Sequence, residues 1–238
     1  MTRVMPSGPE KPRLAIFDRH QGAVDVSGVH CRHRTMSKQR TYNRIARLYD
    51  LLDLPFEHLR YKPVRKIIFS GLSGQVLDAG VGTGRNMPHY PPEATMTGVD
   101  LSPGMLARAD QRQRRLQVPV TLHQADIMAT DFDDHSFDCV VATFLFCVLD
   151  AEHQTPALVE LNRICRPGGE IRIIEYAISE HPVRRAIMRL WAPWVRWAYG
   201  AAFDRNTEQY LDAAGLELVE QRFIHRDIIK LLVVRRKA

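Results

Sequence analysis

One short stretch, residues 76–84, limits the possible folds of this chain more than any other. It reads Val-Leu-Asp-Ala-Gly-Val-Gly-Thr-Gly, an apolar run that ends in three glycines at alternate positions. Short apolar runs are typical of buried strands, and glycine lets the backbone turn sharply and approach a ligand without a Cβ in the way. We therefore predict a strand over residues 75–79, and then a tight loop over residues 80–84 that opens a helix.

The alternation of strands and helices continues along the chain. Apolar runs predict strands over residues 95–100, 118–124, 137–146 and 170–176. Ser102 and Pro103 supply the N-cap and first turn of one helix, and residues 155–165 form another before Pro167. Residues 216–224 and 228–235 form a final hairpin, so one of its strands is antiparallel. The prediction is an α/β fold with a doubly wound, mostly parallel sheet and an antiparallel C-terminal strand.

The N-terminal part of the chain differs from the rest. Residues 1–40 contain eight lysines and arginines against three acidic residues, an excess of five within the formal net charge of +6. Residues 1–35 also lack periodicity, so we expect a disordered basic extension there and one domain over residues 36–238. This domain is expected to begin with helices over residues 37–53 and roughly 56–70. The remaining chain is nearly balanced in charge, so no nucleic-acid partner is expected.

The spacing of cysteine and histidine argues against a metal site. The four cysteines form no C-x-x-C pair, and the ten histidines form no H-x-x-x-H or H-E-x-x-H pair. Reduced, buried thiols of a cytoplasmic protein are expected instead. No run approaches the roughly 18 apolar residues that a membrane span requires.

The aspartate before the glycines separates two possible cofactors. A dinucleotide fingerprint is G-x-G-x-x-G, whereas the third glycine of this loop comes one residue early. Asp78 would repel a pyrophosphate, yet it can pair with the ammonium group of a methionine-like ligand. Together with Gly80, Gly82 and Gly84, it therefore predicts S-adenosylmethionine (SAM) as the cofactor in preference to NAD.

Three more polar residues lie at the ends of predicted strands, where an open parallel sheet binds ligands. Asp100 can accept hydrogen bonds from both ribose hydroxyls, or it can cap the next helix. Asp126 can accept from the adenine amino group, or it can be an ordinary turn aspartate. Thr143 can face the ligand or be a buried strand threonine. The four positions together, each at the end of a successive strand, favour a complete SAM site.

Five segments carry a family resemblance: residues 42–50 (Tyr-Asn-Arg-Ile-Ala-Arg-Leu-Tyr-Asp), 76–84, 98–106 (Gly-Val-Asp-Leu-Ser-Pro-Gly-Met-Leu), 137–138 (Phe-Asp) and 166–169 (Arg-Pro-Gly-Gly). With them the chain resembles the class I SAM-dependent methyltransferases. It is most similar to the branch of ubiquinone/menaquinone C-methyltransferases and bacterial phospholipid N-methyltransferases. The resemblance implies a seven-stranded Rossmann-like sheet and a helix that brings Tyr49 over the cofactor. It also implies that SAM is held by Thr83, Asp100, Leu101, Asp126, Ile127 and Thr143.

The sequence indicates the methyl acceptor less specifically than the cofactor. Methyl transfer from a sulfonium is an in-line displacement that needs alignment, dry surroundings and, for some acceptors, a base. Glu175 and Tyr176 end a predicted strand where the acceptor should lie, so they are candidate catalytic residues. Alternatively, Glu175 pairs with an arginine and Tyr176 belongs to the core.

All three tryptophans lie within residues 191–197. Helical spacing puts Trp191 and Trp194 on one apolar face of a predicted helix, with arginines roughly opposite. A basic amphipathic helix with tryptophan suits a membrane surface or a lipid. Trp191 and Trp194 are therefore candidate substrate-binding residues, and peripheral membrane contact is expected. In the alternative, the helix is a lid packed on the sheet.

The expected function is methyl transfer to a lipid-like or small apolar acceptor. N-methylation of a phosphatidylethanolamine-type headgroup is the first choice, and C-methylation of a ubiquinone or menaquinone precursor is the second. A thiol or another small metabolite is a third choice. A non-catalytic nucleotide-binding protein is the alternative from another class, and the intact glycine loop and Asp100 argue against it. The sequence assigns no oligomeric state.

Overall fold

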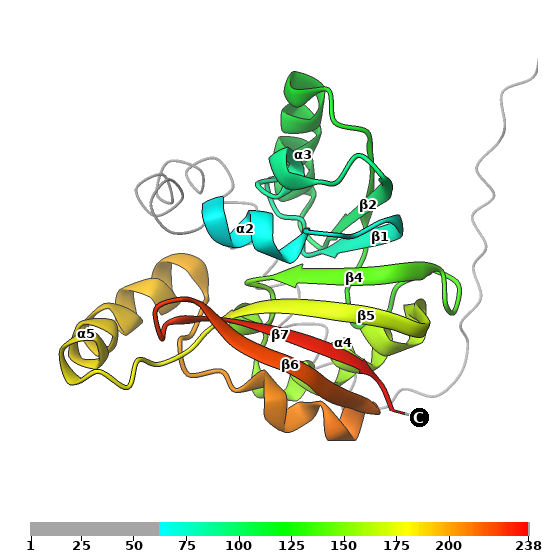
Figure 1. Cartoon of the computed structure of the whole chain (residues 1–238). Coiled ribbons are helices and arrows are strands. Elements are labelled where there is room, and N and C mark those ends of the chain that lie inside the picture. The colour runs from blue at the N-terminus through cyan, green and yellow to red at the C-terminus, as the bar shows by residue number, and fades with distance from the viewer. Residues whose placement is uncertain (1–61, 238) are drawn as a thin grey trace, which may run out of the picture.

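The computed structural model of this chain describes residues 62–237 (Figure 1). The expected extension over residues 1–35, the helix over residues 37–53 and Tyr49 lie outside the described residues.

Seven strands form one sheet in the order β3-β2-β1-β4-β5-β7-β6. They are β1 (Gly74–Ala79), β2 (Ala94–Asp100), β3 (Val120–Gln124), β4 (Phe137–Thr143), β5 (Cys165–Tyr176), β6 (Leu216–His225) and β7 (Ile229–Arg236). Neighbouring strands are parallel except that β7 runs antiparallel to both β5 and β6. The fold class predicted from the sequence, including the antiparallel C-terminal strand, is confirmed.

Helices cover both faces of the sheet because its central strands are apolar on both sides. Adjacent residues such as Val76 and Leu77, or Ile173 and Ile174, are fully buried and belong to different core clusters. One cluster packs against α4 (Ala151–Ile164) and the short 3₁₀ helices η4 (Thr207–Tyr210) and η5 (Asp212–Ala214). The other packs against α2 (Lys62–Ile68) and α3 (Pro103–Leu116). This two-sided burial is typical of a parallel sheet.

The segment after β1 differs from the prediction. Instead of a helix that opens at Gly84, a series of turns leads into a three-residue 3₁₀ helix, η2 (Met87–His89), and Tyr90 is extended. The helix prediction was wrong because Pro91 and Pro92 cannot continue a helix, and a residue before proline prefers extended backbone.

The strand predicted over residues 137–146 is also shorter in the structure. β4 ends at Thr143, and Phe144 has a left-handed φ of 55°. That backbone costs a residue with a side chain about 1–2 kcal/mol. The chain turns there into η3 (Phe146–Val148). The apolar run continues past the turn, so hydropathy alone could not locate the end of the strand.

Two further boundaries lie earlier than predicted. The α4 helix begins at Ala151, four residues before the predicted start. Its first turn is held by Gln154, whose amide donates to the carbonyls of Phe146 and Leu149 at 2.8 and 3.0 Å. The β5 strand begins at Cys165, directly after this helix, through an irregular pairing with Phe137. Both changes depend on contacts between segments and not on local pattern.

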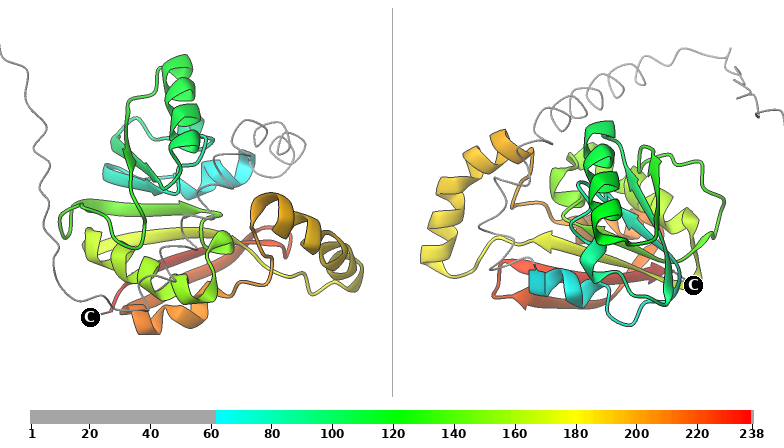
Figure 2. Two further views of the ribbon diagram at one scale, coloured as in Figure 1. Left: turned by 180° about the vertical axis from the view of Figure 1, so that it is seen from behind. Right: turned by 90° about the horizontal axis from the view of Figure 1, so that it is seen from above.

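The α5 helix (Pro182–Tyr199) lies beyond the carboxyl ends of β4 and β5 and projects from the body of the molecule (Figures 1 and 2). Its N-terminal end is fixed to the turn before β7, because Asp227 accepts from the Ser179 hydroxyl at 2.6 Å and pairs with Arg184 at 3.0 Å. The helix ends where Gly200 adopts a left-handed φ of 66°. No helix within residues 62–237 is long and apolar enough to cross a membrane.

Candidate functional site

The glycine loop follows β1 at the carboxyl edge of the sheet, and its three glycines serve different needs. All have left-handed φ values, 75° at Gly80, 54° at Gly82 and 78° at Gly84. A Cβ on Gly80 would lie 2.9 Å from the Leu145 side chain, and one on Gly84 would lie 2.7 Å from Met87. A Cβ on Gly82 would meet nothing closer than 3.9 Å. Gly80 and Gly84 therefore allow close packing, whereas Gly82 leaves open space that a ligand can use.

Asp78 lies beneath this loop in a buried hydrogen-bond network. The Asn86 amide donates to its two carboxylate oxygens at 3.0 and 2.9 Å, and the Tyr90 hydroxyl donates to one of them at 2.6 Å. Arg65 of α2 in turn donates to the Asn86 side-chain oxygen at 2.5 Å. Complete burial raises the pKa of Asp78 to about 6, although these partners oppose the rise. Two side chains therefore hold the carboxylate through three hydrogen bonds, and Arg65 in turn holds Asn86.

The sequence prediction missed Arg65, Asn86 and Tyr90. No local pattern links them to Asp78, since they come from α2 and from the turns around η2. The same network reaches Thr143, because the Asn86 amide lies 3.3 Å from the Thr143 hydroxyl. The structure thus joins Asp78 and Thr143 through Asn86. Thr83 is buried in the loop itself, where Arg112 of α3 donates to its hydroxyl at 3.3 Å.

Asp100 ends β2 and ties the glycine loop to the start of α3. It accepts from the Gly82 N–H at 2.9 Å and from the Ser102 N–H at 2.8 Å, while Ser102 caps α3 by accepting from Met105. Burial raises the pKa of Asp100. A carboxylate offers about four acceptor positions, so two backbone bonds leave room for ribose hydroxyls. Asp100 therefore bonds both to the glycine loop, through Gly82, and to the start of α3, through Ser102.

The remaining predicted cofactor residues lie along the same edge. Leu101 follows Asp100, and its carbonyl accepts from Gln124 of β3 at 3.4 Å. Asp126 accepts from the Met128 N–H at 3.0 Å, which is the bond of a turn aspartate. Ile127 is buried in the core cluster that faces α4. The structure therefore places these three residues directly after the carboxyl ends of β2 and β3.

Glu175 is fully buried near the end of β5 in a polar cluster. Thr207 donates to one of its carboxylate oxygens at 3.3 Å, and the other oxygen has no hydrogen-bond partner within residues 62–237. Burial raises the pKa of Glu175 to about 8, although the neighbouring Lys230 ammonium, the Thr207 hydroxyl and the Cys147 backbone N–H oppose this rise. Lys230 lies opposite Glu175 in β7 and forms an ion pair with Glu208. The predicted arginine partner is thus replaced by a lysine shared with Glu208.

Tyr176 belongs to an aromatic cluster with Phe144 and Phe203. Its ring stacks on Phe144 at 4.7 Å between centroids, and Phe203 meets it edge-on at 5.2 Å. All three side chains are half-buried.

Trp191 and Trp194 pack against one another on α5 at 5.8 Å, with 52% and 37% of their surfaces exposed. Val183, Ile187 and Leu190, which share this face of the helix at helical spacing, are also exposed. The alternative of a lid with its apolar face on the sheet is therefore wrong.

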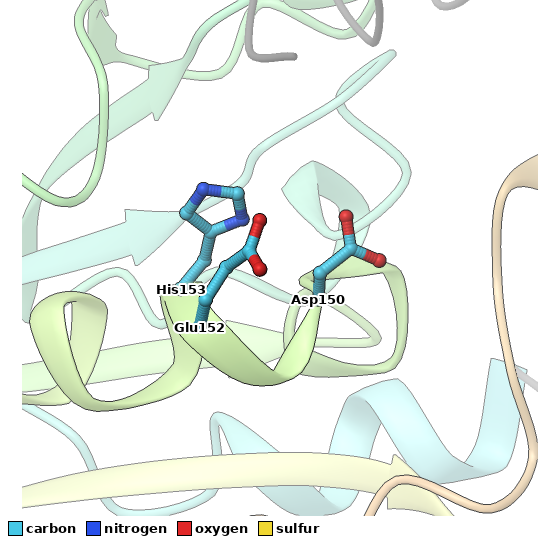
Figure 3. A group of neighbouring side chains, drawn as sticks. All are labelled: Asp150, Glu152 and His153. Carbon is cyan, nitrogen blue, oxygen red and sulfur yellow. The ribbon is translucent and has the colours of Figure 1, made fainter. Parts of the chain in front are cut away.

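Asp150, Glu152 and His153, at the first turn of α4, have ligand atoms within 4.8 Å of one another (Figure 3). Asp150 already forms an ion pair with Arg205 at 3.1 Å.

Comparison with known proteins agrees with this geometry. Residues 76–169 match the family described as methyltransferase domain. A phosphatidylethanolamine N-methyltransferase of Cereibacter sphaeroides is 33% identical over 189 residues, covering 76% of this chain and 88% of the relative. A ubiquinone/menaquinone biosynthesis C-methyltransferase of Geobacter sp. is 31% identical over 201 residues, covering 79% and 82%. The structure of a SAM-dependent methyltransferase from Aquifex aeolicus matches with a TM-score of 0.59 at 19% identity, covering 81% of this chain and 97% of that one.

Proposed function

Because this chain belongs to the class I SAM-dependent methyltransferases, we propose that it methylates the amino headgroup of a phosphatidylethanolamine-type phospholipid at a membrane surface. SAM supplies an electrophilic methyl group when bound. The residues at the carboxyl edge fit this cofactor. Gly82 leaves open space, and the half-buried carboxylates of Asp100 and Asp126 suit its ribose hydroxyls and adenine amino group. Asp78, which is fully buried and bonded to Asn86 and Tyr90, supplies negative charge that suits the ammonium.

The single observation that carries the proposal is the outward apolar face of α5. Leu190 and Trp197 are 80% and 81% exposed, and Val183, Ile187 and Trp191 accompany them on the same face. The opposite side of the helix, including Met188, is partly buried against the protein. The helix carries four arginines and no acidic residue. An exposed face of aromatic and aliphatic side chains with basic flanks suits the boundary of an anionic bilayer. We therefore assign the protein to peripheral contact with the cytoplasmic membrane surface.

Glu175 is our candidate for the proton acceptor of this reaction. A headgroup ammonium must lose one proton before its nitrogen lone pair can attack the methyl carbon. Because Glu175 is fully buried and alternates with Tyr176 along β5, the proton would reach its carboxylate through an intervening water molecule or hydroxyl group. The nitrogen then gains the methyl group as the carbon–sulfur bond breaks. A buried carboxylate with a pKa of about 8, one of whose oxygens is unpaired within the described part of the chain, suits such a base.

The second candidate function is C-methylation of a quinone precursor. The stacked rings of Phe144 and Tyr176 offer a flat surface to a planar acceptor. The relatives named as quinone methyltransferases support this choice to a similar extent as the phospholipid relative.

Methyl-labelled SAM and two sets of vesicles separate the candidates. One set contains phosphatidylethanolamine with phosphatidylglycerol, and the other replaces phosphatidylethanolamine by phosphatidylcholine and adds a demethylated menaquinone. We expect label in methylated phosphatidylethanolamine. Label in the quinone alone would transfer the assignment to the second candidate. Label only in aqueous products of a cell extract would contradict both and favour a thiol or another metabolite, and SAM binding without any product would favour a non-catalytic protein.

The membrane contact has its own test. Replacing Leu190 and Trp197 together by glutamine removes two side chains whose burial is worth about 1.5–3 kcal/mol each, so vesicle co-sedimentation should weaken at least about tenfold. Val219 on β6 is also exposed, and Val219→Gln serves as the matched control. Equal vesicle binding by both variants would contradict the proposal that the apolar face of α5 contacts the membrane.

A further inference from the structure

The aromatic cluster of Phe144, Tyr176 and Phe203 gathers rings from three separate parts of the chain. Phe144 follows β4, Tyr176 ends β5, and Phe203 follows α5. The stacked and edge-on contacts fix the rings relative to one another. Since the rings are half-buried, each keeps surface that another group can contact.

The cluster lies next to the cofactor residues. Phe144 follows Thr143 directly, and Thr143 contacts the Asn86 amide that also binds Asp78. The carboxyl ends of β1 and β4 are neighbours in the sheet, so the aromatic cluster stands beside the end of the site where the Asp78 network lies.

The backbone at Phe144 provides a second, independent observation. A phenylalanine is held in left-handed backbone, where glycine or asparagine is usual, and its N–H donates to the Ile174 carbonyl at 2.9 Å. Conformations of this kind persist where surrounding structure enforces them, and they gather at functional sites. In this chain the unusual φ turns the chain out of β4, and the ring stacks on Tyr176.

We propose that the aromatic cluster binds the amino headgroup of the acceptor, with its positive charge against the ring faces. This inference rests on the proposed phospholipid function and deepens it. Ring faces attract ammonium groups, and the attraction increases when water is excluded. The reaction moves positive charge from sulfur to nitrogen, so rings beside the nitrogen also stabilise the methylated product. The helix α5 follows β5 in the chain, and its exposed Arg189 and Arg196 carry positive charge that suits the phosphate of the same headgroup.

The test compares substitutions at one ring. Tyr176→Phe keeps the aromatic face, whereas Tyr176→Leu keeps only an apolar side chain. We expect Tyr176→Leu to raise the KM for phosphatidylethanolamine about tenfold and Tyr176→Phe to change it less than about twofold. Calorimetric affinity for SAM should stay unchanged in both variants, which also shows that the site is folded. Phe223→Leu is the matched control, because Phe223 is 51% exposed on β6, the edge strand of the sheet.

Fluorination separates charge recognition from apolar contact. Phenylalanine with one, two or three fluorines at position 176 keeps the ring shape while it weakens the negative face. We expect the logarithm of KM to rise with each fluorine. The inference would be overturned if fluorination did not change the KM for phosphatidylethanolamine, or if Tyr176→Leu left this KM unchanged. Either result would count against it even if phosphatidylethanolamine is methylated.

A soluble probe distinguishes failure of this inference from failure of the proposed function. Phosphocholine carries the fully methylated headgroup and needs no turnover, so its binding is measured by calorimetry with S-adenosylhomocysteine present. Binding that falls about tenfold in Tyr176→Leu supports the ammonium site even if no phospholipid is methylated. Phosphocholine that binds wild type and Tyr176→Leu equally would contradict it. Inorganic phosphate, measured in parallel, accounts for the anionic part.

Discussion

The replacement of Glu175 by glutamine tests both the stability and the chemistry inferred for the end of β5. The side chain is fully buried, and Lys230, its neighbour across the sheet, pairs with Glu208. Glutamine has nearly the shape of a protonated glutamate and cannot ionise. The substitution therefore removes the cost of a buried charge and leaves the packing in place.

The expected size follows from the pKa of Glu175. A folded-state pKa of about 8 against an ordinary value of 4.5 corresponds to roughly 5 kcal/mol of preference for the protonated form. Between these values the folded protein binds more protons than the unfolded chain. The wild type should therefore lose stability as pH rises from 5 to 9, whereas Glu175→Gln lacks this loss. The free-energy difference between the two proteins should change by at least about 2 kcal/mol over that range, in favour of the glutamine variant.

Urea unfolding at pH 5, 7 and 9 measures this difference. Glu160→Gln is the control, because Glu160 has a lowered pKa: burial raises it, but bonds from Arg163 and Thr130 outweigh burial. A lowered pKa gives stability that is present above the unfolded value and lost only as pH falls. Glu160→Gln should therefore be destabilised by a nearly constant amount from pH 5 to 9. If the Glu175→Gln difference is equally independent of pH, the assignment of a buried, largely protonated Glu175 is refuted.

The same variant tests the proposed base. If Glu175 accepts the headgroup proton, wild-type turnover should rise with pH around 8, and Glu175→Gln should turn over at least about tenfold more slowly and lose that rise. A rate and pH profile like those of the wild type would leave Glu175 with a structural role only.

Three other predictions concern the cofactor site. Gly84→Ala should lower stability by about 1–3 kcal/mol, measured by thermal unfolding, because its Cβ would clash with a neighbouring side chain. Gly168→Ala has a similar φ of 81° but open space and should cost about 1 kcal/mol, so equal losses would contradict the role of the clash. Tyr90→Phe removes a donor to Asp78 and should raise the pKa of Asp78 further, so SAM affinity should fall at pH 6.5 and recover by pH 8. A loss that persists at pH 8 would argue for a steric cause. Asp100→Asn should weaken calorimetric SAM binding at least about tenfold, and unchanged affinity would refute the ribose assignment.

The sequence predicted correctly those features that depend on consecutive residues. The glycine loop and the apolar runs around it indicated a parallel sheet and a SAM-type site, because strand burial and glycine backbone freedom are local properties. Asp100 could be placed for the same reason, since it directly follows a strand and precedes a capped helix.

The prediction failed where the outcome depends on residues far apart in the chain. The pattern identified Asp78 but not Arg65, Asn86 and Tyr90, which hold it. The helix expected after Gly84 does not form, because Pro91 and Pro92 follow several residues later and cannot continue it.

By itself, the sequence determined the alternation of the sheet, the cofactor class and the amphipathic character of α5, because each depends on short-range spacing. Only the tertiary structure decided that the apolar face of α5 points outward, that Glu175 lies beside Lys230 and not an arginine, and that Phe144, Tyr176 and Phe203 meet. These arrangements join separate segments, and packing in three dimensions selects them from many that local pattern allows.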